Sequence, residues 1–467
     1  MKLTFFGAAQ NVTGSKHLVE TQAGSFLFDC GLHQGKRKEA EYLNKHFPIN
    51  AAMLDSVLLS HAHADHCGML PVLVRSGFKG KIYATGATTD IAKYILEDSA
   101  KIQEQDCDFL TRHIPEKGPY TPLYTVEDVE KTLPFFSPTP YFSISKSWTP
   151  LQADVRFKFY DAGHILGSAT TLVEIHEGQE TKTILYSGDL GHSPAPLLRN
   201  PELIEEQVDT LILEATYGNR LHDPVQVAEN KLADIVNEAI EKKSKIFVPA
   251  FALGRTQEII YILHKLHNEN RIPHLKIFVD SPLSTSISEV FSKHTEDYDE
   301  ETWQDFGSLG QVPLEFPGLE YVSSIEDSKK LNTMQGPFMV IAASGMMEGG
   351  RIRHHLAHNI SDPNNYLLIT GYQAIHTLGR KIHHGESPVK ILEHWYDVRA
   401  KVITINEFSA HADRNQLLTF AQSLKGLKKI FLVHCEPREG ESLKSLLISK
   451  MPGVEIVIPA LKESYTI

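Results

Sequence analysis

The chain has 467 residues, a formal net charge of −12, and hydrophobic and charged contents of 42% and 22%. A chain of this length usually forms more than one hydrophobic core, so we expect two domains. The composition is typical of a globular protein. The excess of 58 acidic over 46 basic residues argues against binding nucleic acid through overall charge, although bound metal ions can reverse the sign locally.

The sequence also bears on the compartment. No segment approaches the roughly 20 apolar residues needed to span a membrane, and the N-terminus lacks the apolar run of a signal peptide. The four cysteines show no CxxC spacing and no disulfide-scaffold density, so reduced thiols are expected. We therefore expect a cytoplasmic protein that does not enter a membrane.

The first quarter of the chain is predicted to be rich in strands separated by glycine and polar turns. Asp29 ends one of these strands, and a buried run before Ser60 leads into a histidine-rich stretch. Functional groups collect at strand ends in α/β proteins, so both places are candidates for a site. The expected strands are 2–6, 17–20, 25–29, 55–60 and 82–85, and the expected helices are 68–76 and 88–111.

Three histidines and one aspartate lie within six residues in His61-Ala62-His63-Ala64-Asp65-His66. Imidazole suits zinc, and a carboxylate beside it can hold a second divalent ion. Because side chains alternate along extended backbone, His61 and His63 are expected to point the same way, whereas His66 begins a helix. An exposed histidine-rich loop is the alternative, but such a loop requires neither the acid nor the buried strand before it. The stretch predicts ligands for two neighbouring ions.

Two further metal-type residues follow predicted strands at glycine turns. His164 comes after Gly163, and Asp189 comes after Gly188, where glycine lets the backbone turn sharply. A lone His164 would be more typical of a buried core histidine, but the shared placement favours a metal site. Residues 115–150 are expected to be irregular except for a short helix near 126–133, and strands are expected at 155–160, 170–176 and 183–186.

From Asp209 the pattern changes to alternating buried strands and helices, which is typical of a second α/β domain with a parallel sheet. After about Val398 the strands are expected to rejoin the first sheet, so the second domain is predicted to be an insertion. The strands expected from here on are 210–214, 245–250, 275–280, 338–343, 366–370, 401–405, 429–433 and 454–459, with helices at 225–242, 256–268, 284–294, 350–358, 413–424 and 439–450.

The ordered set of candidate ligands resembles a known family. Asp29, the His61–His66 stretch, His164 and Asp189 resemble the four signature motifs of the metallo-β-lactamase fold. Three further motifs resemble those of its β-CASP nuclease subfamily: Glu214 in LILEATYG, His411 in FSAHAD and His434 in LVHCEP. The pattern is most similar to the bacterial and archaeal proteins related to the nuclease subunit of the eukaryotic cleavage and polyadenylation factor.

The resemblance implies an α/β protein made of a metallo-β-lactamase αββα sandwich with an inserted parallel-sheet β-CASP domain. The expected segments are 1–208 and 398–467 for the sandwich and 209–397 for the insertion. The implied cofactor is a pair of zinc ions, although the same ligands can hold manganese. One ion would be bound by His61, His63 and His164, the other by Asp65, His66 and His434, with Asp189 bridging them and Asp29 orienting ligands from behind.

The resemblance further implies catalytic roles for Asp65, Glu214 and His411. His411, held by Glu214, is the candidate general acid; a purely structural pair joining the domains is the alternative. Phosphate recognition is expected from backbone N–H groups at a helix start and from basic side chains, and Arg255 and Arg380 fit interdomain salt bridges equally well. These candidates are Arg255, Ser344, Gly345, Arg351 and Arg380.

The implied function is zinc-dependent hydrolysis of RNA phosphodiester bonds in a cleft between the two domains. Endonuclease activity is expected, and an additional 5′-exonuclease activity is an open alternative. His434 favours RNA, because the DNA-directed branch of the family lacks a histidine there. Hydrolysis of a small substrate and a catalytically silent RNA-binding subunit are the alternatives, and a homodimer is expected only by analogy. Two positions depart from the family pattern. Cys435 replaces a common glycine in the loop beside a candidate ligand, and Ile375-His376 replaces a common Glu-Gly and is expected to alter the substrate channel.

Overall fold

The computed structural model describes residues 1–35, 37–222, 224–371, 373–374, 376–405 and 408–467. It divides into two compact units. The first unit comprises Met1–Ser193, Asn200–Leu221 and His411–Ile467, and the second comprises Pro194–Arg199 and His222–Ala410. Whether 1–208, 209–397 and 398–467 act as separate domains stays a prediction.

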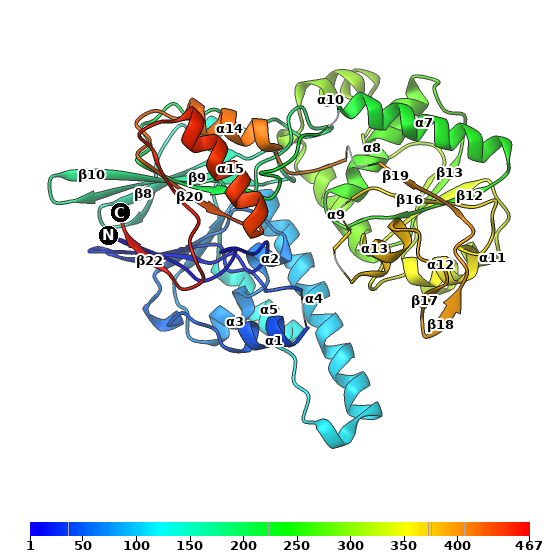
Figure 1. The fold of residues 1–467 in the computed structure, drawn as a ribbon, viewed down its shortest axis with the longest axis horizontal. Helices are drawn as coiled ribbons and strands as arrows, with labels where there is room; N and C mark the ends of the chain where they lie inside the picture. Colours follow the sequence, from blue (N-terminus) through cyan, green and yellow to red (C-terminus); the bar gives the residue numbers. More distant parts are fainter. Residues whose placement is uncertain (36, 223, 372, 375, 406–407) are drawn as a thin grey trace. The chain divides into compact units, whose positions relative to one another are not determined.

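The first unit contains two sheets of seven strands each (Figure 1). The first sheet has the order β22 (Ser464–Thr466), β1 (Lys2–Phe5), β2 (His17–Thr21), β3 (Gly24–Phe28), β4 (Ser56–Leu58), β5 (Lys81–Ala84) and β6 (Phe136–Pro138). The second has the order β21 (Glu455–Val457), β20 (Lys429–Val433), β11 (Thr210–Glu214), β10 (Glu180–Tyr186), β9 (Ala169–Glu177), β8 (Val155–Asp161) and β7 (Thr149–Gln152).

Both sheets combine antiparallel and parallel pairing, and this pairing brings several strand ends together. In the first sheet β3, β4 and β5 run parallel, so the segments after Phe28 and Leu58 emerge on one edge. In the second sheet β10, β11 and β20 run parallel, with Glu214 beside Val433 in the register. The loops that leave these strands therefore gather at common edges.

Apolar side chains fill the space between the two sheets and also cover their outer faces. Phe28 and Leu58 of the first sheet belong to one buried cluster with Phe157, Tyr186 and Phe431 of the second. In Figure 1 the helices α3 (Leu70–Arg75) and α5 (Val126–Thr132) lie on one side of this pair of sheets and α14 (Arg414–Ser423) and α15 (Pro437–Lys450) on the other. The expected αββα sandwich is confirmed.

Helix α4 (Gly86–His113) packs its first half on the outer face of the first sheet, where Ile91, Leu96 and Ala100 are buried. Thr85 caps it by accepting a hydrogen bond from the backbone N–H of Thr88. The first unit also contains the short helices α1 (Arg37–Lys45), α2 (Ala64–Cys67) and α6 (Phe142–Ser145). Among the described residues, no helix combines the length and the apolar character required to cross a membrane.

The second unit has one six-stranded sheet in which all neighbouring strands are parallel. Its order is β14 (Leu319–Tyr321), β13 (Lys276–Val279), β15 (Phe338–Ala342), β12 (Lys245–Pro249), β16 (Tyr366–Ile369) and β19 (Lys401–Thr404). The helices are α7 (Val225–Glu241), α8 (Arg255–Asn268), α9 (Pro282–Lys293), α10 (Glu300–Asp305), α11 (Ile325–Thr333), α12 (Ile352–Asn359) and α13 (Leu378–His383), and a hairpin joins β17 (Val389–Ile391) to β18 (His394–Tyr396). This parallel α/β sheet was expected.

Two strands belong to a different sheet from the one predicted. β11 was grouped with the inserted parallel sheet, but it pairs with β10 and β20 in the first unit. β19 was expected to rejoin the first unit, but it pairs with β16 in the second. Buried parallel strands have the same apolar sequence pattern in any sheet, so the pattern could not assign these two.

Candidate metal centre

The predicted ligands converge in the first unit because each follows the end of a strand. The His61–His66 stretch follows β4, His164 follows β8, Asp189 follows β10 and His434 follows β20. These four strands thus direct residues far apart in sequence to one place. The structure brings together all seven predicted ligands in three overlapping groups of potential metal ligands.

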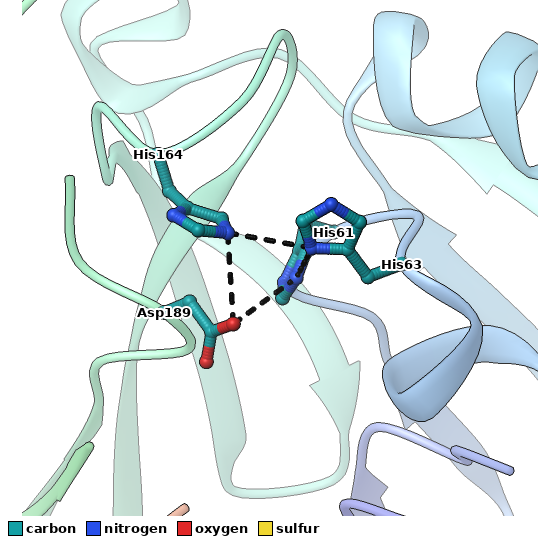
Figure 2. Close-up of side chains that lie close together, drawn as sticks. All are labelled: His61, His63, His164 and Asp189. Atoms are coloured by element: carbon teal, nitrogen blue, oxygen red, sulfur yellow. Dashed lines mark hydrogen bonds and ion pairs between the residues drawn. The ribbon is translucent and has the colours of Figure 1, made fainter. Parts of the chain in front are cut away.

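The first group consists of His61, His63, His164 and Asp189 (Figure 2). His61 Nε2 lies 3.0 Å from His63 Nδ1, and His164 Nε2 lies 3.3 Å from the same atom. Asp189 Oδ2 completes the group at 3.5 Å from His61 Nε2 and 3.6 Å from His164 Nε2. Three imidazole nitrogens and one carboxylate oxygen that face a common point are the donor set of a zinc site.

The second group consists of Asp65, His66 and His434. Asp65 Oδ2 lies 3.3 Å from His434 Nε2 and 4.0 Å from His66 Nε2. The second oxygen of Asp189, Oδ1, lies 3.5 Å from His66 Nε2. One carboxylate therefore faces the first group with Oδ2 and the second group with Oδ1.

The residues present fit a divalent ion in the second group. His66 Nε2 and Asp189 Oδ1 are buried and make no hydrogen bond within the described part of the chain. Buried polar atoms are normally satisfied, and an unmet ion is one recognised reason for an exception. A cation between the two atoms would satisfy both.

Asp29 determines how two of the histidines present their nitrogens. Its Oδ2 accepts a hydrogen bond from His66 Nδ1 at 2.7 Å, so the neutral form of the His66 ring has its lone pair on Nε2. Ser60 Oγ donates to the same oxygen at 2.8 Å and must therefore accept from His61 Nδ1, 3.0 Å away. His61 is thereby held with its lone pair on Nε2 as well, as a metal ligand requires.

Thr216 determines the tautomer of His434 in a similar way. Its hydroxyl lies 3.0 Å from both the carbonyl oxygen and Nδ1 of His434. The carbonyl can only accept, so the hydroxyl donates to it and accepts from Nδ1–H. His434 Nε2 then carries the lone pair and faces Asp65.

Glu214 and His411 form a buried pair beside the two groups. Glu214 Oε1 accepts from His411 Nδ1 at 3.0 Å and from the backbone N–H of Leu190 at 2.8 Å, and the Glu214 side chain is fully buried. The His411 ring is 19% exposed and lies 4.6 Å from the ring of His164. Because Glu214 engages Nδ1, proton exchange with a substrate would involve Nε2.

Charges at the centre shift the pKa values in opposite directions. Burial and neighbouring imidazoles lower the pKa of His61 well below its usual value, and burial lowers that of His63 to about 4, so both rings are neutral at physiological pH. Burial alone would also lower the pKa of His411, but the carboxylates of Glu214 and Asp189 outweigh it and raise this pKa to about 10. His411 therefore carries a proton on both ring nitrogens, whereas His61 and His63 each keep one nitrogen with a free lone pair.

The five candidate phosphate contacts all lie in the second unit. Arg351 donates to Asp280 Oδ1 at 2.6 Å and to the carbonyl oxygens of Val322 and Ser323. These bonds connect residues within the second unit. Arg255 likewise pairs with Glu258 at 2.7 Å. Ser344 and Gly345 lie in the loop before α12, and Arg380 lies on α13. Their role in phosphate recognition stays a prediction.

The two departures from the family pattern differ in what the structure says of them. Cys435 is fully buried directly after His434, and a Cβ atom on Gly440 would lie 2.9 Å from its Sγ. The thiol thus packs into the core beside α15. Ile375 lies outside the described residues, and His376 is exposed in a turn before α13.

Sequence reasoning missed the hydroxyl groups around the centre. Ser60, Thr216 and Tyr186 each bond to Asp29 or His434, yet none belongs to a residue type that signals a metal site. Position provided one signal, because Ser60 adjoins His61 and Thr216 lies two residues after Glu214. Tyr186 ends a strand distant in sequence from Asp29 and offered no comparable signal.

Comparison with family models matches three consecutive parts of the chain. The metallo-beta-lactamase superfamily matches residues 14–250, the Beta-Casp domain matches 256–382, and the Zn-dependent metallo-hydrolase RNA specificity domain matches 395–459. These descriptions agree with the use of a metal ion by the clustered histidines and aspartates.

Similar proteins match along nearly the whole chain. Ribonuclease TTHA0252 of Thermus thermophilus is 36% identical over 97% of this chain and 96% of its own length. The RNase J-like protein of Methanocaldococcus jannaschii is 29% identical over 98% and 96%, and the transcription termination factor FttA of the same organism is 29% identical over 93% and 67%.

A solved structure shares the fold at low sequence identity. It is a protein of unknown function from Enterococcus faecalis V583, 12% identical, with a TM-score of 0.54 over 100% of this chain and 99% of that one. The superfamily model alone spans more than half of the chain, and a relative 36% identical matches almost all of it. The chain therefore belongs to the metallo-β-lactamase superfamily and to its β-CASP branch.

Proposed function

We propose that the protein is a zinc-dependent ribonuclease that hydrolyses phosphodiester bonds of RNA with two zinc ions in the first unit. The observation that supports this most is Asp189, whose two carboxylate oxygens face two separate groups of ligands. Paired metal sites of this kind are typical of enzymes that cleave phosphodiesters. The RNA specificity domain and relatives named as ribonucleases support RNA as the substrate.

In this proposal one ion would be held by His61, His63 and His164 and the other by Asp65, His66 and His434, and Asp189 would contribute to both sites. When bound, such ions act as Lewis acids that make water nucleophilic near neutral pH and offset the charge of the phosphate. Asp29, Ser60 and Thr216 keep the nitrogens of the ligands in the required tautomers. Manganese fits the same donor atoms, so zinc is assigned by donor type and by the family description.

His411 is the general acid of the proposed reaction. The leaving ribose oxygen needs a proton, and His411 holds one because Glu214 and Asp189 raise its pKa to about 10. Glu214 fixes the ring through Nδ1 and directs the Nε2 proton to the substrate. A silent RNA-binding subunit has no need of a complete ligand set, which this chain retains. A cytoplasmic location and a homodimer stay predictions.

The proposal is tested with RNA carrying either a 5′ label or internal labels, incubated with the zinc-loaded protein. Cleavage is expected, and it should be lost after chelation and in Asp65→Ala. The label pattern separates internal cuts from stepwise removal of 5′ nucleotides. Asp108→Ala is the matched control, because Asp108 is an exposed aspartate on α4. The Asp108→Ala protein should cleave RNA normally. Cleavage that persists both after chelation and in Asp65→Ala would refute the proposal.

A further inference from the structure

Behind Asp29 lies a buried row of polar groups that the proposed reaction does not use. Tyr186, the last residue of β10, places its hydroxyl 2.6 Å from Asp29 Oδ2 and 3.0 Å from Ser15 Oγ. Ser15 Oγ in turn lies 3.3 Å from His17 Nε2 on β2. Tyr186 is 1% exposed, and Ser15, His17 and Asp29 are fully buried. The row therefore connects the two sheets of the first unit inside the core.

The direction of the hydrogen bonds along this row follows from the acceptor at its end. The Asp29 carboxylate only accepts, so the Tyr186 hydroxyl donates to it. The oxygen of Tyr186 then accepts from the Ser15 hydroxyl, and Ser15 Oγ accepts from His17 Nε2–H. In the reverse arrangement no hydrogen would lie between Ser15 and Tyr186. Every donor thus points towards Asp29.

The remaining nitrogen of His17 supports this direction. Burial lowers the pKa of His17 to about 3, so the ring is neutral and carries a single N–H. Nδ1 is buried and has no hydrogen-bond partner among the described residues. A buried N–H without an acceptor is rarer than a buried acceptor without a donor. The proton is therefore on Nε2, where Ser15 accepts it.

Asp29 joins this row to both groups of metal ligands. Its Oδ2 accepts from Tyr186, from His66 Nδ1 and from Ser60 Oγ, and its Oδ1 accepts from the backbone N–H of Ser60. His66 belongs to the second ligand group. Ser60 accepts a hydrogen bond from His61 Nδ1 and so connects Asp29 to the first group. A rotation of this one carboxylate would disturb a ligand in each group.

Hydrogen bonds that line up in one direction polarise and strengthen one another in a buried setting. Without the Tyr186 hydroxyl, Oδ2 would lose its shortest contact, and the carboxylate could turn about its side-chain bonds. A purely structural role is the competing explanation, in which the row only fastens β10 to β2 and β3. The two explanations differ in whether metal affinity changes more than stability does.

We propose that Tyr186, supported by Ser15 and His17, is a positioning residue for both metal ions, because its hydroxyl holds Asp29 in the orientation that sets the tautomers of His61 and His66. The inference rests on the proposed metal centre. Tyr186 has no contact with substrate in this scheme and acts only through Asp29. Its effect should therefore appear in metal binding before any reaction takes place.

The test compares Tyr186→Phe with the wild-type protein, both stripped of metal and then titrated with zinc in competition with a chromophoric chelator. The variant keeps the ring, which packs 5.0 Å from Phe28, and loses only the hydroxyl. We expect zinc affinity to fall about tenfold, the lower end of the usual effect of outer partners of metal ligands. In the cobalt-loaded protein, the visible absorption bands should shift.

Tyr124→Phe is the matched control. Tyr124 is also fully buried, and its hydroxyl also bonds a serine, Ser99 on α4, at 2.8 Å. Both variants lose a tyrosine–serine hydrogen bond, and Tyr186→Phe also loses the bond to Asp29, so its metal-free form should unfold at a somewhat lower temperature than that of Tyr124→Phe. Only Tyr186→Phe should lose zinc affinity. Equal affinity in the two variants would show that the row is structural and overturn the inference.

Ser15→Ala provides a second variant in case Tyr186→Phe does not fold. It leaves the bond from Tyr186 to Asp29 and removes both the donor to Tyr186 and the acceptor of the His17 Nε2–H, so a smaller loss of zinc affinity in the same direction is expected. Unchanged affinity in Ser15→Ala would overturn the role of the row behind Tyr186. Failure of the wild-type protein to bind zinc would instead refute the proposed metal centre itself, so the two failures are distinguishable.

Discussion

Asp29 and Asp189 divide the work at the metal centre between them. Asp189 faces both ligand groups with separate oxygens. Asp29 contacts His66 and Ser60 and thereby determines which ring nitrogens of the ligands carry the lone pair. Metal ligands of this type were predictable, because histidine and aspartate at strand ends have a recognisable spacing. The hydroxyls of Ser60, Thr216 and Tyr186 were not, because their roles depend on partners that only the fold brings near.

At the residue scale, Glu214→Gln should move the pH dependence of the cleavage rate. His411 acts while protonated, so its activity is present below its raised pKa of about 10 and is lost as the pH rises through that value. Removing the carboxylate charge takes away the main group that raises this pKa. The alkaline limb of kcat should therefore move to lower pH, towards or below the ordinary histidine value of about 6.5.

The measurement is kcat on labelled RNA across the pH range. The control is Glu229→Gln, a glutamate that is 4% exposed and pairs with Lys265 in the second unit. Its alkaline limb should coincide with that of the wild type. An unchanged limb in Glu214→Gln would mean that His411 does not supply the proton.

At the scale of secondary-structure elements, the site depends on tight turns directly after strands. Asp189 is reached from β10 through Gly188, whose φ of +55° is a conformation that favours glycine. A Cβ atom there would lie 2.8 Å from the Cβ of Ser60, the residue before His61. The turn after one sheet thus contacts the loop that carries ligands from the other.

Gly188→Ala should therefore destabilise the protein and weaken metal binding together. The left-handed conformation costs about 1–2 kcal/mol for a residue with a Cβ, and the contact with Ser60 adds to that. Gly178→Ala is the control, because Gly178 has a φ of +66° with nothing within 4 Å of the added Cβ. It should lose stability to chemical denaturation without losing zinc affinity. Equal zinc affinity in both variants would contradict the role given to this turn.

Most strands and long helices could be located from apolar periodicity and glycine turns, but their sheet membership could not. β11 and β19 were assigned to the wrong sheets because a buried parallel strand has the same pattern wherever it pairs. The edge strands β6 and β22 were missed, since each has three residues and little burial. Pairing partners are set by long-range packing, which a local pattern does not contain.

At the scale of the whole molecule, the ligands join distant parts of one chain. His61 and His434 belong to the first unit, yet the second unit is inserted between them in the sequence. A pair of bound ions would add to the contacts that already link these segments, such as the pairing of β22 with β1 and the hydrogen bond from the His434 N–H to the carbonyl oxygen of Ala8. The net charge of −12 also means that the ions would supply positive charge where a phosphate must approach.

Zinc should accordingly stabilise the folded protein against heat. A ligand that binds only the folded state contributes about 2.7 kcal/mol at a free concentration one hundred times its dissociation constant. The transition that involves the first unit should move to higher temperature when zinc is added to stripped protein, and chelation should reverse the shift. Calorimetry of the wild type and of Asp65→Ala would check this, and a shift of equal size in both would contradict it.

The claim on which the account depends is a pair of ions that share Asp189. Anomalous diffraction at the zinc edge, from crystals of the zinc-loaded protein, tests it most directly. The account predicts two peaks, one among His61, His63, His164 and Asp189 and one among Asp65, His66, His434 and Asp189. A single peak, or peaks away from these residues, would contradict it.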